Sequence, residues 1–136
     1  MPEKRNIVLI TLDSLRADHC SFMGYNRKTT PTIDKMAKNG LYFENAIAFT
    51  LPTAPSMYSI FTGREWPIGL NILSAKDWRK AFKNTQTLAE ILQKEGYTTI
   101  AIHANPYVSR FFSFDKGFTY FEDFLSKKFN EIKFIL

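Results

Sequence analysis

Asp13 is the first side chain in the sequence that could do chemistry, because it directly follows a short apolar run. The run, Ile7–Leu12, is rich in β-branched residues, and this pattern predicts a strand buried on both faces of a parallel sheet. Open parallel sheets bind ligands at the carboxyl ends of their strands. Asp13 is therefore a candidate ligand for a metal or phosphate group, although an aspartate in this place also commonly begins a turn.

Thr53 is the second candidate, at the start of the segment TAPSMYSIFTG. The segment predicts a helix with Thr53 as its N-cap and with Met57, Ile60 and Phe61 as its buried stripe. A helix N-terminus presents unpaired N–H groups and a positive potential that favour an anion. A hydroxyl group there could act as a nucleophile, activated by a metal and aimed at a phosphoryl or sulfuryl group. The alternative is a threonine that only caps the helix, which is the commoner role.

Other polar residues carry weaker signals. Asp18, His19 and Cys20 are adjacent, but three neighbours in one loop do not easily reach one ion, and no CxxC or HxxxH spacing supports a metal site. His103 follows a predicted strand without a visible partner, so we expect a structural role. Asn105 precedes a proline, which favours an extended or turn conformation.

The elements that position these residues alternate between strands and helices. Thr30 and Pro31 predict the start of a helix that ends at Gly40, with Thr30 as its cap. The segment Leu41–Phe49 predicts a second strand, parallel to the first because such connections are right-handed. Further along we expect a short helix or loop at 77–83, a capping box at Thr87–Glu90, a strand at 97–102, a turn at 115–117 and a helical apolar face through Phe121, Phe124, Leu125, Lys128, Phe129 and Ile132.

Composition limits the class of protein. The chain has 136 residues, of which 45% are apolar and 23% charged, as is typical of a globular domain with a core. The net charge of +5 permits anionic substrates, but the lysines and arginines are scattered, which argues against a nucleic-acid partner. One cysteine excludes an internal disulfide. No signal-peptide-like or membrane-spanning apolar stretch occurs, so we expect a cytoplasmic chain with no membrane span.

Five segments together resemble the N-terminal part of sulfatases, in the alkaline-phosphatase superfamily. They are NIVLITLD, RADHCSFMGYNRKTTPTIDKMAKNGLYFENAIA, TAPSMYSIFTGR, TLAEILQKEGYTTIAI and FDKGFTYFED. The resemblance implies an α/β fold with a mostly parallel sheet flanked by helices, of which this chain is the N-terminal portion. It also implies hydrolysis or transfer of a small-molecule or glycan sulfate or phosphate ester at a divalent metal (Mg, Mn or Ca). By motif position, Asp13 matches a metal ligand, and Thr53 matches the nucleophile and a second ligand.

The chain departs from the sulfatase pattern at four places. Sulfatases carry a Cys or Ser at the position of Thr53 and oxidise it to formylglycine, and a Thr cannot serve that maturation. Thr53 instead resembles the phosphodiesterase, phosphonate-hydrolase and phosphoglycerol-transferase branches. Met57 replaces the signature arginine, Ser14 replaces a second aspartate, and the segment at 103–106 replaces the stretch Gly-Lys-Trp-His. All four departures point away from a true sulfatase.

Asp13 and Thr53 alone are too few ligands for a divalent cation, which takes four or more. We therefore expect a single sulfatase-like domain over residues 1–136 that is incomplete, because the family places further ligands downstream. Two hypotheses follow. The chain is either the N-terminal portion of a metal-dependent ester hydrolase, or a truncated, inactive relative that acts by binding or by self-association through its apolar C-terminal face.

Overall fold

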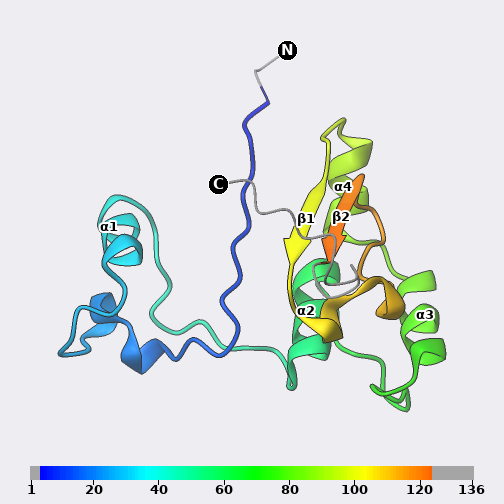
Figure 1. The fold of residues 1–136 in the computed structure, drawn as a ribbon, viewed down its shortest axis with the longest axis horizontal. Coiled ribbons are helices and arrows are strands. Elements are labelled where there is room, and N and C mark those ends of the chain that lie inside the picture. The colour runs from blue at the N-terminus through cyan, green and yellow to red at the C-terminus, as the bar shows by residue number, and fades with distance from the viewer. Residues whose placement is uncertain (1–3, 124–136) are drawn as a thin grey trace, which may run out of the picture. The chain divides into compact units, whose positions relative to one another are not determined.

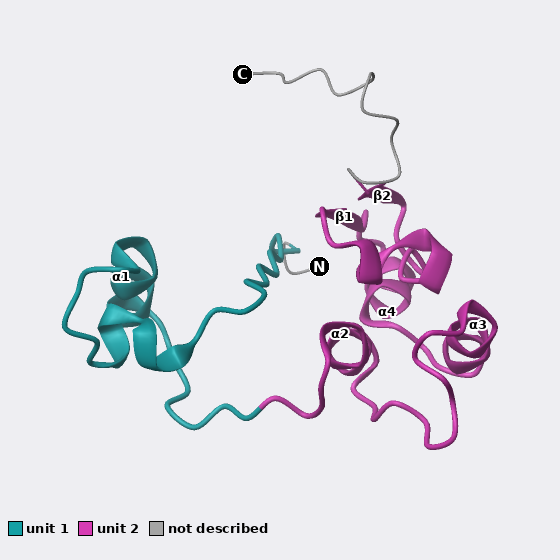
Figure 2. Ribbon diagram, turned by 60° about the horizontal axis from the view of Figure 1, so that its bottom comes forward, with its two compact units in different colours: residues 1–47 teal, residues 48–136 magenta. Residues whose placement is uncertain are grey.

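The computed structural model describes residues 4–123 of the chain. The chain divides into two compact units, Met1–Ile47 and Ala48–Leu136, which Figure 2 draws in teal and magenta. We call them the first and the second unit and describe each by itself. The expectation of one incomplete domain stays a prediction.

The first unit contains two 3₁₀ helices, Ala17–His19 and Ser21–Met23, and the helix α1, Pro31–Asn39 (Figure 1). The predicted start of α1 is confirmed, with Pro31 in its first turn. The predicted capping by the Thr30 side chain is wrong. Its hydroxyl group instead donates to Asp34 Oδ1 at 2.9 Å and accepts from the Ser21 N–H at 3.0 Å. Thr30 therefore joins the helix to the preceding loop.

The two strands predicted in this region do not form within residues 4–123. The runs 7–12 and 41–49 have no partner strand there, and their side chains are largely exposed, with Val8 at 79% and Leu41 at 84%. A strand exists only through hydrogen bonds to a neighbour, so β-branched composition alone does not produce one.

The second unit contains the helices α2 (Thr53–Thr62), α3 (Ala75–Lys83) and α4 (Leu88–Lys94) and the strands β1 (Ile100–His103) and β2 (Tyr120–Asp123). Two further 3₁₀ helices, Pro106–Val108 and Arg110–Phe112, lie in the connection that leads from β1 to β2. The strands are parallel, in a register that runs from Ile100 opposite Tyr120 to His103 opposite Asp123. Helices with a parallel sheet confirm the α/β class (Figure 1).

Several local predictions for the second unit are confirmed. The capping box forms, since the Thr87 hydroxyl accepts from the Glu90 N–H while the Glu90 carboxylate accepts from the Thr87 N–H. Helix α3 covers the segment at 77–83 and begins after Ser74, whose hydroxyl accepts from the Asp77 N–H. The third predicted strand forms, but it starts at Ile100 and not at residue 97.

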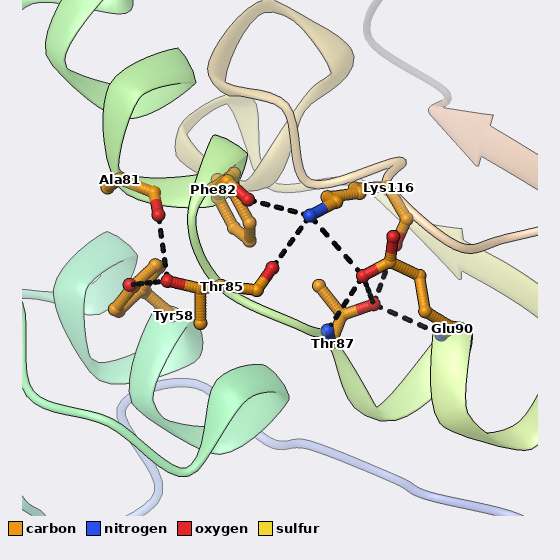
Figure 3. A network of polar contacts seen from close by, with 7 residues as sticks. All are labelled: Tyr58, Ala81, Phe82, Thr85, Thr87, Glu90 and Lys116. Carbon is orange, nitrogen blue, oxygen red and sulfur yellow. Dashed lines mark hydrogen bonds and ion pairs between the residues drawn. The ribbon is translucent and has the colours of Figure 1, made fainter.

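Two predictions for side chains in the second unit are wrong. Phe121 was expected on a helix but lies in β2, opposite Ala101, because a short apolar segment suits either structure until a partner strand decides. The other members of that predicted face lie outside the described residues. In α2, Ile60 is exposed because the helix packs Ala54, Tyr58 and Phe61 against the core. The buried Tyr58 hydroxyl has a partner in Thr85 Oγ1 at 3.0 Å (Figure 3).

An aromatic cluster forms the core of the second unit. Trp78 is fully buried, and rings from α2, α3 and the segment before β2 surround it. The Trp78 ring centroid lies 6.2 Å from those of Tyr58 and Phe82 and 5.2 Å from that of Phe114. The Phe82 ring also contacts Tyr58 at 5.1 Å and Phe114 at 5.2 Å, and all of these pairs are tilted or edge to face. Among the described residues, no helix combines the length and apolar character that crossing a membrane requires.

Candidate functional site

Thr53 is the first residue of α2, and Pro52 occupies the N-cap position. The prediction that Thr53 caps the helix is therefore wrong by one residue, because the chain enters the helix one position earlier. Thr53 is half-buried, and Ala54 and Pro55 behind it are buried, which holds the start of the helix against the core. Its hydroxyl group thus sits in the first helical turn, at the positive end of the helix dipole.

Helix α2 packs against Pro106–Val108, the 3₁₀ helix that follows the carboxyl end of β1. The helix that begins with Thr53 is therefore a neighbour of the sheet edge where α/β proteins bind ligands. Asn105 begins the 3₁₀ helix, since its Oδ1 accepts from the Tyr107 N–H at 2.9 Å. This confirms the prediction that Asn105 has a turn role.

His103 and Asp123 are opposite each other at the carboxyl ends of β1 and β2. The His103 ring contacts the Phe121 ring at a centroid distance of 4.8 Å, and both of its nitrogens are buried without a hydrogen-bond partner among residues 4–123. Asp123 is 4% exposed. Asp123 was not among the predicted site residues, because the apolar pattern that starts at Phe121 predicts a helix and not the end of a strand.

Arg110 brings a cation to the same edge. It donates to Asp115 Oδ2 at 3.1 Å and to the Phe121 carbonyl oxygen at 2.7 Å, and its guanidinium group lies 5.2 Å from the centre of the Phe121 ring. Three separate contacts therefore hold one positive charge beside β2.

Asp13 belongs to the first unit and is exposed. It lies in a turn with Ser14, which has a left-handed φ of 62°, and the Leu15 N–H donates to the Leu12 carbonyl oxygen at 3.5 Å. The turn agrees with the simpler interpretation of this aspartate. Since Thr53 belongs to the second unit, neither unit contains both predicted ligands.

Divalent cations need four or more ligands. Within residues 4–123 no group of three or more His, Cys, Asp or Glu side chains could hold a metal ion. The Asp18 carboxylate is bonded to the Arg16 guanidinium group at 2.7 and 3.0 Å and to His19 Nδ1 at 3.1 Å, and the arginine holds the pKa of that carboxyl well below its usual range. The residues that the structure describes thus do not by themselves form a site for the divalent metal that the resemblance implies.

Comparison with known proteins gives one family. The family model described as Sulfatase matches residues 5–131. Similar proteins include Arylsulfatase H of Homo sapiens, 33% identical over 104 residues (69% of this chain, 18% of the relative). Iduronate 2-sulfatase of Homo sapiens is 32% identical over 98 residues (71% of this chain, 18% of the relative). N-acetylgalactosamine-6-O-sulfatase of Bacteroides thetaiotaomicron is 31% identical over 99 residues (71% of this chain, 19% of the relative).

The chain spans less than a fifth of the length of these relatives. No solved structure gives a significant match.

Proposed function

Because the chain belongs to the sulfatase family, we propose that it is the N-terminal portion of a hydrolase of sulfuric or phosphoric esters, with Thr53 as the nucleophile. One observation carries the proposal: within the matched residues 5–131, a hydroxyl group stands at the first position of a helix. The first-turn N–H groups of such a helix favour the negative charge of a sulfate or phosphate group.

The proposed reaction has two steps. The Thr53 oxygen attacks the phosphorus or sulfur atom and gives up its proton, while the bond to the alcohol breaks and the alcohol leaves with a proton. A water molecule then attacks the phosphorus or sulfur atom, the bond to the Thr53 oxygen breaks, and the phosphate or sulfate leaves with the oxygen of the water while a proton restores the Thr53 hydroxyl group. The positive potential at the start of α2 stabilises the charge on the non-reacting oxygens during both steps.

The identity of Thr53 favours phosphate esters over sulfate esters as the substrate. Formylglycine is an aldehyde made from Cys or Ser, whereas the Cβ atom of Thr53 carries a methyl group that prevents formation of an aldehyde. The hydroxyl group itself is then the nucleophile, as in the phosphodiesterase-like branches that this sequence resembles.

We assign no step to a metal, because the described residues do not assemble a site for one. Asp13 is proposed as one ligand of a divalent cation (Mg, Mn or Ca) in the whole protein. Its motif position within the matched residues 5–131 supports this role.

The test compares the hydrolysis of bis-p-nitrophenyl phosphate, p-nitrophenyl phosphate and p-nitrophenyl sulfate by the whole protein with added Mg²⁺, Mn²⁺ or Ca²⁺. We expect Thr53→Ala to lower kcat by roughly a thousandfold or more, as loss of a nucleophile does, and Thr53→Ser to retain measurable turnover. Ser59→Ala is the control, because its hydroxyl group lies in the same helix and donates to the Pro55 carbonyl oxygen. Full turnover in Thr53→Ala would contradict the assignment.

A further inference from the structure

The loop that precedes α1, one side of α1 and Tyr42 after it line an open pocket of about 510 Å³ within the first unit. This volume lies within the range of about 300 to 1,000 Å³ that is common for small-molecule sites. Neither Asp13 nor Thr53 lines it. The pocket is therefore a feature that the proposed ester hydrolysis does not use.

The wall of the pocket carries more positive than negative charge. Arg27, Lys28 and Lys38 line it, and Asp34 is the one acidic residue among the lining residues. None of the ion pairs within residues 4–123 includes any of the three cations. Their charges are therefore available to an anion that enters the pocket.

The charge of Asp34 is already engaged by the loop. Its carboxylate accepts from the Ser21 hydroxyl at 2.7 Å, the Thr30 hydroxyl at 2.9 Å and the Phe22 N–H at 3.1 Å. The Ser21 hydrogen bond holds the pKa of Asp34 below its usual range. Asp34 thus fixes the loop onto α1, and among the described residues it forms no ion pair with Lys38.

Three aromatic rings complete the wall. The Phe22 and Tyr42 rings meet edge to face with centroids 5.7 Å apart, and the Tyr42 hydroxyl donates to Glu44 Oε1 at 3.2 Å. Tyr25 packs against the His19 ring at 4.7 Å. These contacts hold the rings in place, so that they present apolar surface beside the cations.

We propose that this pocket binds a ring-bearing sulfate or phosphate ester, with the ester oxygens on Arg27, Lys28 and Lys38 and the ring against Phe22, Tyr25 and Tyr42. Cations beside aromatic surface match the two parts of such a molecule. Aryl esters and sugar esters share this chemistry. Binding here requires no reaction at Thr53, so the inference goes beyond the proposed function.

The test follows backbone amide signals by NMR while p-nitrophenyl sulfate or glucosamine 6-sulfate is added to the 136-residue chain carrying Thr53→Ala, which prevents turnover. We expect shifts centred on residues 21–42, and we expect the neutral p-nitrophenyl glucoside and N-acetylglucosamine to bind at least tenfold more weakly. Whichever ester binds more tightly identifies the source of the ring. The absence of shifts with both esters would overturn the proposal.

Matched variants separate the pocket from general attraction of anions by a basic chain. Lys38→Gln should weaken binding of the ester about twofold to fivefold, and the double variant Lys38→Gln with Arg27→Gln should weaken it about tenfold or more. These factors correspond to the free energies of exposed ion pairs. Lys35→Gln is the control, because Lys35 is an exposed lysine of the same helix that does not line the pocket. Equal weakening by Lys35→Gln would overturn the proposal. Tyr42→Ala should weaken the esters but leave inorganic sulfate unchanged, which tests the ring wall.

Discussion

Lys116 and Glu90 form an ion pair with 3.4 Å between Nζ and Oε2, and the same ammonium group donates to the carbonyl oxygens of Phe82 at 2.7 Å and Thr85 at 2.6 Å (Figure 3). Phe82 lies in the last turn of α3, and Glu90 lies in the first turn of α4. One side chain thus connects the turn before β2 to the end of one helix and the start of the next. This places a cation at a helix C-terminus, where the unpaired carbonyl groups favour positive charge.

Lys116→Met should lower the free energy of unfolding of the second unit by about 2 to 4 kcal/mol, because two carbonyl groups and a carboxylate each lose one of their partners, and that partner is charged. Urea unfolding followed by tryptophan fluorescence measures this unit, since Trp66 and Trp78 both lie in it. Lys80→Met, an exposed change on α3, should stay within about 0.5 kcal/mol of the original protein. Equal effects of the two changes would contradict the network.

The Glu90 carboxylate makes the second unit sensitive to acid. Burial raises its pKa, but the hydrogen bond from the Thr87 N–H and the charge of Lys116 outweigh burial, so the pKa lies below the usual 4.5. A lowered pKa in the folded state means that the stabilisation is present above pH 4.5 and is lost as the pH falls through the folded value. Glu90→Gln should therefore make the free energy of unfolding fall less steeply as the pH drops below 4.5. Lys116→Met should have the same effect in part, because Lys116 contributes to the lowered pKa of Glu90. An unchanged slope in Glu90→Gln would show that other carboxylates carry the acid sensitivity.

Gly117 lies so close to α4 that it tolerates no side chain. Its φ is 84°, and a Cβ atom there would lie 2.5 Å from the Glu90 nitrogen and 2.8 Å from Thr87 Oγ1. Gly69 has the same φ of 84° but nothing within 4 Å of its Cβ position. Gly69→Ala should cost about 1 to 2 kcal/mol for the left-handed backbone alone, whereas Gly117→Ala should cost at least about 2 kcal/mol more. Equal melting temperatures would refute the close approach.

His103 and Thr85 give opposite predictions for the removal of a buried polar group. The His103 nitrogens have no hydrogen-bond partner within residues 4–123, whereas the Thr85 hydroxyl pairs with Tyr58 and donates to the Ala81 carbonyl oxygen. His103→Leu should leave the free energy of unfolding unchanged or raise it by about 1 kcal/mol, and Thr85→Val should lower it by about 1 to 3 kcal/mol. A large loss in His103→Leu would reveal a partner for the ring.

Features with a short range along the chain were predictable from the sequence. The capping box of Thr87 and Glu90, the end of α2 at Gly63 with a φ of 66° and the turn role of Asn105 each depend on residues within four positions of one another. The amino-acid types alone specify such contacts, because few backbone conformations satisfy them. Asp13 and Thr53 were also identified from the sequence, first from an apolar run and a helix start and then from a family resemblance, and their chemical roles stay predictions.

The tertiary structure decided everything that joins distant segments. Composition could not show that Phe121 belongs to a strand, or that Asp123 lies opposite His103 at the end of that strand. A strand needs a partner, and here the partner is 20 residues away in the sequence. Composition also could not show that Lys116 donates to two carbonyl groups more than 30 residues earlier in the chain. The hydrogen bond from the Ser21 hydroxyl to Asp34 in the pocket wall was equally hidden from it. Hydrogen bonds and burial between remote residues depend on how the whole unit packs. Local amino-acid preferences carry little information about that packing.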